Sequence, residues 1–200
     1  MTESTGADRP GLRERKKAKT RVAIQEHALR LFRERGYDET TVEQIAEAAE
    51  ISPSTFFRYF PTKEAVVVYD ALDPVLIAHW RAQPPEVPPV TAFRRAIVQA
   101  FGSLTDKQID DMRERARLVY GVPELRLAMV NDMIRTGDLM LREAALRTGR
   151  SADDFELRIF TGALMGAFTA AVYPAIDDPK ADYLELMGRV FDYLEKGMPL

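Results

Sequence analysis

Apolar residues recur along most of the chain at the spacing of an α-helix. In the first such segment, Ile24, Ala28 and Phe32 lie four residues apart, so a helix over about residues 13–35 would carry one apolar stripe. The only run of three valines, 66–68, lies inside a longer helical pattern. The pattern therefore predicts an all-α protein.

Two short helices are predicted next, because capping residues stand close together. Thr41 can cap the first helix, and Gln44 three residues on completes a capping box. Ser52 is a good N-cap for the second helix, which is expected to run to Phe60. Pro53 suits the first position of that helix, since its missing N–H would be unpaired there. Two short helices joined by a tight turn form a helix-turn-helix.

Six further helices are expected, which brings the total to about nine. The first of them starts at Lys63, and Pro74 is expected to kink it. The proline-rich segment 84–89 is expected to be a loop. The remaining helices are expected at about residues 90–104, 106–119, 123–148, 152–173 and 180–196.

The second short helix has two unlike faces. Phe56 and Phe60 are four residues apart and can pack inward, whereas Ser54, Thr55 and Arg58 fall together on the opposite face. A recognition helix in the major groove of DNA needs an apolar inner side and short polar side chains facing outward. An ordinary helical hairpin in a bundle is the other interpretation of this pattern.

The amino-acid composition excludes several classes of function. The chain of 200 residues has no cysteine and two histidines, which excludes a disulfide framework, a cysteine nucleophile and a multi-histidine metal site. No carboxylate stands in a pattern with a nucleophile or a metal partner, so no catalytic residue, cofactor or metal is expected. No apolar run reaches the roughly 18 residues that span a bilayer, and a cytoplasmic protein is expected.

A net charge of −3 conceals a basic N-terminal part. Seven Lys and Arg residues stand between Arg9 and Arg21, opposed only by Glu14. Such a block can bind a polyanion. It is equally typical of a solvated tail that keeps a protein soluble.

The helix-turn-helix resembles the DNA-binding signature of the tetracycline-repressor (TetR) family. The resemblance covers about residues 18–68 and is carried by Thr40-Thr41-Val42, Ile45-Ala46, Ala49, Ile51-Ser52, Thr55-Phe56-Phe57, Tyr59-Phe60 and Lys63-Glu64. It implies an N-terminal three-helix DNA-binding domain and a C-terminal helical domain. We therefore expect a flexible basic arm over residues 1–12, a DNA-binding domain over 13–63, and a ligand-binding and dimerisation domain over 64–200.

The resemblance also implies DNA contacts at particular positions. Carried over position by position, these are Thr41, Ser54, Thr55, Phe57, Tyr59 and Lys63, to which the outward face of the second short helix adds Arg58. Phe57 stands where the family more often has tyrosine, so a thymine methyl or a sugar replaces a phosphate as its expected contact. Glu50 replaces a common turn glycine, which predicts a turn without positive φ.

The family resemblance implies a homodimer that binds palindromic operator DNA and releases it when a small molecule binds. The phrase from Ser52 to Phe60 is similar to a branch described as binding acyl-CoA-like ligands, so an acyl-CoA or a fatty acid is the expected effector. Abundant Met and Phe favour an apolar cavity among the helices of residues 90–173. Its expected lining includes Phe101, Met129, Met133, Phe160 and Phe168. The alternative function is a helical enzyme or a small-molecule carrier that does not bind DNA.

The dimer is expected to form through about residues 152–196. Gly162 and Gly166 lie on one face of the first of the last two helices and allow close approach of a partner helix. The second of these helices has an apolar stripe of Tyr183, Met187, Val190, Phe191 and Leu194. Pairing both helices with their copies would form a four-helix bundle. Alternatively, the glycines pack against helices of the same chain.

Overall fold

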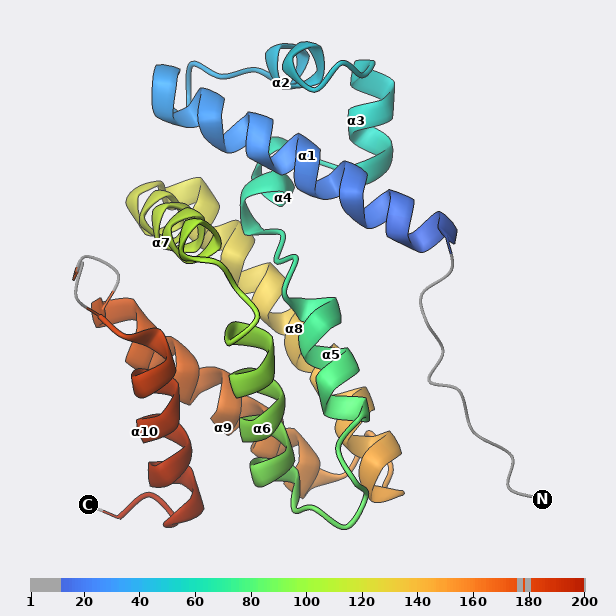
Figure 1. Ribbon diagram of the computed structural model, residues 1–200, viewed down its shortest axis with the longest axis vertical. Helices are drawn as coiled ribbons and strands as arrows, with labels where there is room; N and C mark the ends of the chain where they lie inside the picture. The colour runs from blue at the N-terminus through green and yellow to red at the C-terminus, as the bar shows by residue number, and fades with distance from the viewer. Residues whose placement is uncertain (1–11, 176–177, 179–180, 200) are drawn as a thin grey trace. The chain divides into compact units, whose positions relative to one another are not determined.

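The computed structural model describes residues 12–175, 178 and 181–199. Over these residues it contains ten α-helices, one 3-10 turn and no strand, which confirms the all-α prediction. The chain divides into two compact units, residues 1–71 and 72–200 (Figure 1). The expected basic arm, residues 1–12, lies outside the described residues except for its last position.

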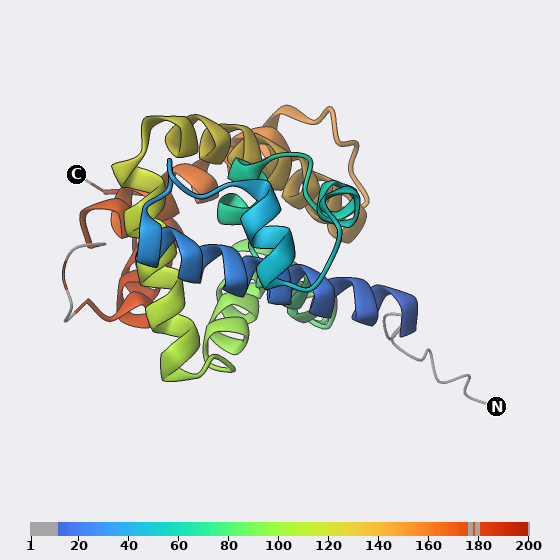
Figure 2. The same cartoon turned by 90° about the horizontal axis from the view of Figure 1, so that it is seen from above.

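The first unit is a small bundle built around one long helix. Its helices are α1 (Leu12–Arg35), α2 (Val42–Ala48), α3 (Pro53–Tyr59) and α4 (Lys63–Val68). Helix α1 packs against α2 and α4, and α2 packs against α3 (Figure 2). The apolar stripe of α1 is buried as predicted, and it meets side chains of the shorter helices. The buried side chains are Ile24, Ala28, Leu31, Phe32, Ile45, Ala46, Phe56, Phe60, Val66 and Val67.

The second unit consists of the remaining helices. They are α5 (Asp73–Arg81), α6 (Pro89–Phe101), α7 (Asp106–Gly121), α8 (Pro123–Thr148), α9 (Phe155–Val172) and α10 (Tyr183–Glu195), with the 3-10 turn η1 (Tyr173–Ala175) after α9. Helix α6 packs against α5 and α10. At the centre of the core, the ring of Phe93 lies 5.8 Å from that of Trp80 and 6.1 Å from that of Phe191.

The prediction of one kinked helix after Lys63 is wrong, because the structure has two separate helices. Helix α4 ends at Val68, and α5 begins at Asp73 with Pro74 in its first turn. Pro74 has no N–H to donate and its ring would clash with the carbonyl four residues earlier, so a continuous helix is disfavoured there. This break accounts for ten α-helices where about nine were expected.

Two arginines bind α5 and the loop after it to α8. Arg81 donates from Nε to the buried carboxylate of Glu143 at 2.8 Å. Arg147 donates to the carbonyls of Gln83 and Val87 at 3.1 and 2.9 Å. The proline-rich segment 84–89, whose last residue begins α6, is thereby held as the loop that its sequence predicts.

Candidate nucleic-acid interface

The α2–turn–α3 segment has the caps that the sequence predicts. The N–H of Gln44 donates to Thr41 Oγ1 at 3.3 Å, and the N–H of Thr41 donates to Gln44 Oε1 at 3.0 Å. At the start of α3, the N–H of Thr55 donates to Ser52 Oγ at 3.1 Å. Because these contacts are local, each short helix begins at a defined residue despite having only seven residues.

Helix α3 presents the two faces expected of a recognition helix. Phe56 and Phe60 are buried, and their rings lie 6.0 Å apart. Ser54 and Arg58 are exposed on the other side, whereas Thr55 and Tyr59 are half-buried. The side chain of Phe57 is also exposed, at 51%, which is unusual for an aromatic residue with no polar atom. An apolar surface therefore lies beside polar groups on the outward face.

Three hydroxyl groups at the start of α3 form a small network. Ser52 Oγ donates to Thr55 Oγ1 at 3.0 Å and lies 2.9 Å from Ser54 Oγ. A serine hydroxyl has one proton, so when Ser52 donates to Thr55, Ser54 must donate to Ser52. Thr55 then keeps its own O–H for an outside acceptor, and Ser54 keeps lone pairs for an outside donor.

The turn between α2 and α3 differs from its prediction. Glu50 has φ 54°, so the expectation of a turn without positive φ is wrong. The turn needs the left-handed conformation for any residue at this position, since the N–H of Ile51 must reach the carbonyl of Ala46, 2.9 Å away. A side chain in this conformation costs about 1–2 kcal/mol, which glycine would avoid.

Lys63 and Glu64, at the start of α4, bind the loop between α1 and α2. Lys63 Nζ donates to the carbonyls of Tyr37 and Thr40 at 2.9 and 3.1 Å and lies 4.1 Å from the centre of the Tyr37 ring. The Tyr37 phenol donates to Glu64 at 2.6 Å. These two bonds use two of the three N–H donors of Lys63 within the unit.

Two side chains that organise this unit were not predicted from the sequence. One is Tyr37, which binds Glu64. The other is Gln25, whose amide donates to the carbonyls of Val66 and Tyr69 at 2.8 and 2.7 Å. The partners of Gln25 are backbone atoms 41 and 44 residues away, so no local pattern could identify them.

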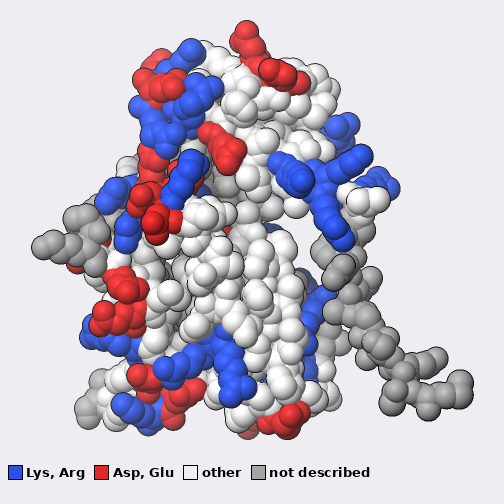
Figure 3. All heavy atoms as spheres, in the orientation of Figure 1, with Lys and Arg blue, Asp and Glu red and all other residues white. Residues whose placement is uncertain are grey.

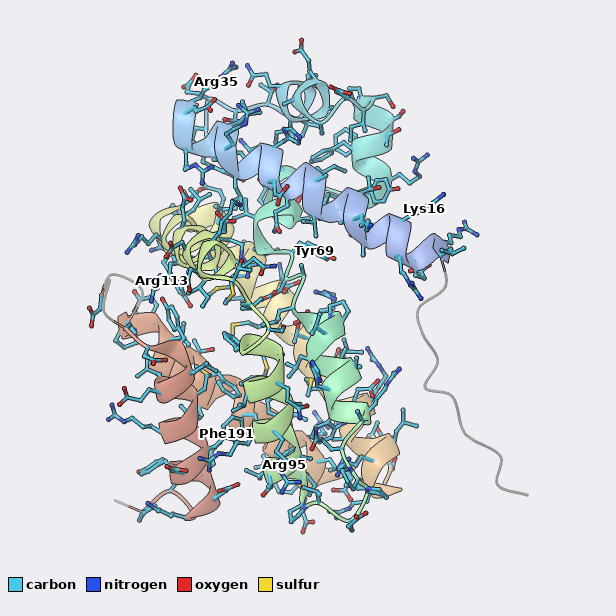
Figure 4. All side chains as sticks on the ribbon, viewed as in Figure 1. Lys16, Arg35, Tyr69, Arg95, Arg113 and Phe191 are labelled. Carbon is cyan, nitrogen blue, oxygen red and sulfur yellow. The ribbon has the colours of Figure 1, made fainter. Side chains whose placement is uncertain are left out.

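Basic side chains gather over the first turns of α1. Arg13, Arg15, Lys16, Lys17 and Lys19 are all exposed. Figure 3 shows Lys and Arg over this end of the helix, and Figure 4 labels Lys16 there. Helix α1 thus supplies a local positive charge in the same unit as α3, in a protein of net charge −3.

The expected ligand-lining residues are not gathered at one site. Phe101, Phe160 and Phe168 pack against the core of the second unit, and the ring of Phe168 lies 5.4 Å from that of Phe191. Met129 is half-buried on α8. Met133 lines a groove of about 400 Å³ between α8 and α9. The other lining residues of this groove are Val130, Ile134, Gly137, Asp138, Leu141, Arg158, Thr161, Gly162 and Met165.

Helix α9 carries an apolar stripe that its own chain leaves exposed. Phe155 is 75% exposed and Ile159 is 56% exposed. The stripe continues at helical spacing through Gly162, Gly166, Ala170 and Tyr173. A Cβ atom added at Gly162 or Gly166 would meet no atom within 4 Å beyond its chain neighbours and its own helix backbone, so these glycines are not needed for packing against other helices of the chain.

The apolar stripe expected on α10 is covered by its own chain, unlike that of α9. Tyr183, Met187 and Phe191 are buried inside their own chain, Tyr183 beside Arg113 of α7 and the other two in the core that α10 forms with α6 and α9. The expectation that they form the dimer contact is therefore wrong for these three residues. An apolar stripe at helical spacing predicts a buried face, but it does not identify the surface that covers that face.

Two family models together match most of the chain. The model described as bacterial regulatory proteins, tetR family, matches residues 24–69. The model described as MftR C-terminal domain matches residues 87–199.

Individual relatives agree with these matches. The chain is 35% identical over 152 residues to the HTH-type transcriptional regulator TcmR of Streptomyces glaucescens, covering 72% of this chain and 67% of TcmR. It is 24% identical over 187 residues to the transcriptional regulator MftR of Mycobacterium tuberculosis, covering 92% of this chain and 93% of MftR. Among solved structures, FadR of Thermus thermophilus, a TetR family transcriptional repressor in complex with lauroyl-CoA, has a TM-score of 0.56 and 26% identity. That match covers 90% of this chain and 95% of FadR.

Proposed function

This chain belongs to the TetR family of bacterial transcriptional regulators, and on that premise we propose that it is a repressor released from a palindromic operator by an apolar effector. The observation that carries the proposal is the outward face of α3. It combines exposed Ser54, Phe57 and Arg58 with a buried aromatic side that holds the helix in place. A helical hairpin whose outer face only meets solvent has no need of an exposed phenylalanine beside a hydroxyl network.

The side chains on and around α3 divide into two roles. Ser54, Thr55 and Arg58 read base edges, and Phe57 contacts a thymine methyl or a sugar. Phosphate oxygens are bound by the remaining predicted contacts, Thr41, Tyr59 and Lys63. The stacking of Arg58 on the Tyr59 ring, 5.5 Å from guanidinium carbon to ring centre, limits the directions in which Arg58 can reach.

A second copy of the chain completes the DNA-binding form. Two successive half-sites in the major groove lie about 34–36 Å apart, so two recognition helices are needed. We assign the dimer contact within residues 152–196 chiefly to the exposed stripe of α9. Gly162 and Gly166 let a partner helix approach closely, and Phe155, Ile159 and Tyr173 supply apolar area.

The same assignment explains the apolar character of α9. The expectation that no apolar run reaches bilayer length is wrong: among the described residues, one helix, Phe155–Ala175, is long and apolar enough to cross a membrane, and only 17% of its most apolar window is buried. In a cytoplasmic regulator, contact with a second copy covers such a helix and removes its apolar side chains from water.

The proposed effector is an acyl-CoA or a fatty acid. Support comes from FadR of Thermus thermophilus, which is 26% identical and was solved with lauroyl-CoA. In this chain the acyl group would lie among the helices of residues 90–173. Part of its lining would be formed by Phe101, Met129, Met133, Phe160 and Phe168. Because three of these rings pack against the core, and the ring of Phe168 lies 5.9 Å from that of Phe93, admission of an acyl chain would repack the surroundings of Phe93.

One binding experiment separates this function from the alternative. A DNA fragment from upstream of the gene is titrated with the full chain at several salt concentrations, with and without lauroyl-CoA. A repressor should bind with an affinity that falls steeply with salt, and lauroyl-CoA should release it. A helical enzyme or a carrier would be stabilised by lauroyl-CoA without binding the fragment.

A further inference from the structure

Helix α4 is too short to hold its position alone, so the contacts at its two ends determine how it is fixed in the first unit. It has six residues, and the last carbonyls of any helix have no partner inside the helix. In a continuous helix, the carbonyl of Val66 would accept from residue 70 and that of Tyr69 from residue 73. The chain is not a continuous helix here, because α4 ends at Val68 and α5 begins at Asp73.

Gln25 on α1 donates to the same two carbonyls. Its amide nitrogen has two protons, and they reach the carbonyls of Val66 and Tyr69 at 2.8 and 2.7 Å. Tyr69, labelled in Figure 4, is held further by Arg21, whose guanidinium carbon lies 5.4 Å from the centre of its ring. The C-terminal end of α4 is thus bound to the middle of α1.

The other end of α4 is bound to the loop after α1. Lys63 donates to the carbonyls of Tyr37 and Thr40, and Tyr37 donates to Glu64. The ring of Tyr69 also lies 5.6 Å from the ring of Phe60, which follows the last residue of α3. Helix α4 is therefore in contact with both α1 and the end of the recognition helix.

We propose that Gln25 is a positioning residue for DNA recognition. Its side chain locks the C-terminal end of α4 to α1, so that α4 and α3 move as one body. The inference rests on the proposed function for its DNA-binding part. The lock itself is a property of the first unit and is tested separately.

The test compares hydrogen exchange in the full chain with Gln25→Met and Gln25→Lys. Methionine keeps the unbranched shape but donates nothing, whereas the lysine ammonium can donate to both carbonyls. In Gln25→Met, amides of residues 63–69 should exchange about tenfold faster, while those of α2 stay at the wild-type rate. Gln25→Lys should restore slow exchange over residues 63–69.

The second part of the test measures operator affinity at constant salt. Gln25→Met should bind about three- to tenfold more weakly, because the recognition helix loses its support. Wild-type exchange over residues 63–69, equal acceleration in α2 and α4, or unchanged operator affinity would each overturn the proposal. If Gln25→Met does not fold, Gln25→Asn, which is too short to reach both carbonyls, is compared with Gln25→Lys by the same criteria. If the wild-type chain binds no operator, the proposed function fails, while the exchange comparison still decides whether Gln25 locks α4.

Discussion

The phenol of Tyr37 donates a 2.6 Å hydrogen bond to the carboxylate of Glu64, which joins the loop after α1 to the first turn of α4. Burial raises the pKa of Glu64. The hydrogen bond from Tyr37, bonds from its own backbone and from Thr62, and the charge of Lys63 outweigh burial and place the pKa below its ordinary value of 4.5. The charged form of Glu64 is therefore the form that the fold favours.

Tyr37→Phe should lower the free energy of unfolding at pH 7 by about 0.5–1.5 kcal/mol, because it removes this bond. Glu64 is half-buried, so solvent screening favours the lower part of that range. The lowered pKa means that the contribution is fully present above pH 4.5 and is lost as the pH falls through the folded-state pKa. Urea unfolding of both chains at several pH values measures the difference. A difference that stays constant down to pH 3 would contradict this role.

Glu50→Gly should raise the free energy of unfolding by about 0.5–1 kcal/mol. Glycine relieves the positive φ of 54°, although its greater freedom in the unfolded chain offsets part of the gain. Glu50→Gln is the matched control, since it keeps the conformation and removes only the charge. Thermal melts of the three chains test this, and a Glu50→Gly chain that melts below wild type would show that the turn is not strained.

Arg58→Ala should change the preferred base at one or two positions of the operator, at a cost of about 1–3 kcal/mol for each. The measurement is binding to a panel of operator variants. Equal weakening on every sequence would show that Arg58 binds phosphate and reads no base.

Lys63→Ala serves as the contrasting variant on the same panel. It should weaken all sequences about equally and lower the salt slope by about one. Because Lys63 also donates to the carbonyls of Tyr37 and Thr40, the chain should melt at a lower temperature. A wild-type salt slope together with a lowered melting temperature would limit Lys63 to a structural role.

Gly166→Leu should convert the dimer to monomer without unfolding the chain. Apart from its two chain neighbours and the backbone of its own helix, no atom lies within 4 Å of the position where its Cβ would be, so the monomer has room there, and α9 gains about 1 kcal/mol of helix propensity. The added leucine side chain would be overpacked only against a partner helix. Sedimentation, operator binding and circular dichroism are measured together. Gly121→Leu, another exposed glycine with open space around it, is the control and should remain dimeric. A dimeric Gly166→Leu chain would place the contact elsewhere.

The caps of the helix-turn-helix could be predicted because they depend on neighbours in the sequence. Thr41 with Gln44 and Ser52 with Thr55 each act within three residues, and the structure confirms the two helix starts that they predict. The break between α4 and α5 was only partly predictable. Pro74 marks the place, but Gln25, from a distant part of the chain, supplies the donors that make a complete break stable.

The surfaces of α9 and α10 could not be assigned from periodicity. Both helices have an apolar stripe at the same spacing, yet Phe191 lies in the core and Ile159 faces outward. The difference depends on where α6 lies, which no local pattern encodes. Likewise, the positive φ of Glu50 follows from the bond between Ile51 and Ala46 and not from the preference of glutamate.

Selection of bound sequences from random double-stranded DNA by the full chain decides whether this protein is a dimeric, operator-binding repressor. Such a repressor should enrich a palindrome whose half-sites lie about one helical turn apart, bound by an even number of chains, and should lose the enriched sequence at high salt. Recovery of no enriched sequence, or of a single asymmetric site bound by one chain, would contradict this function.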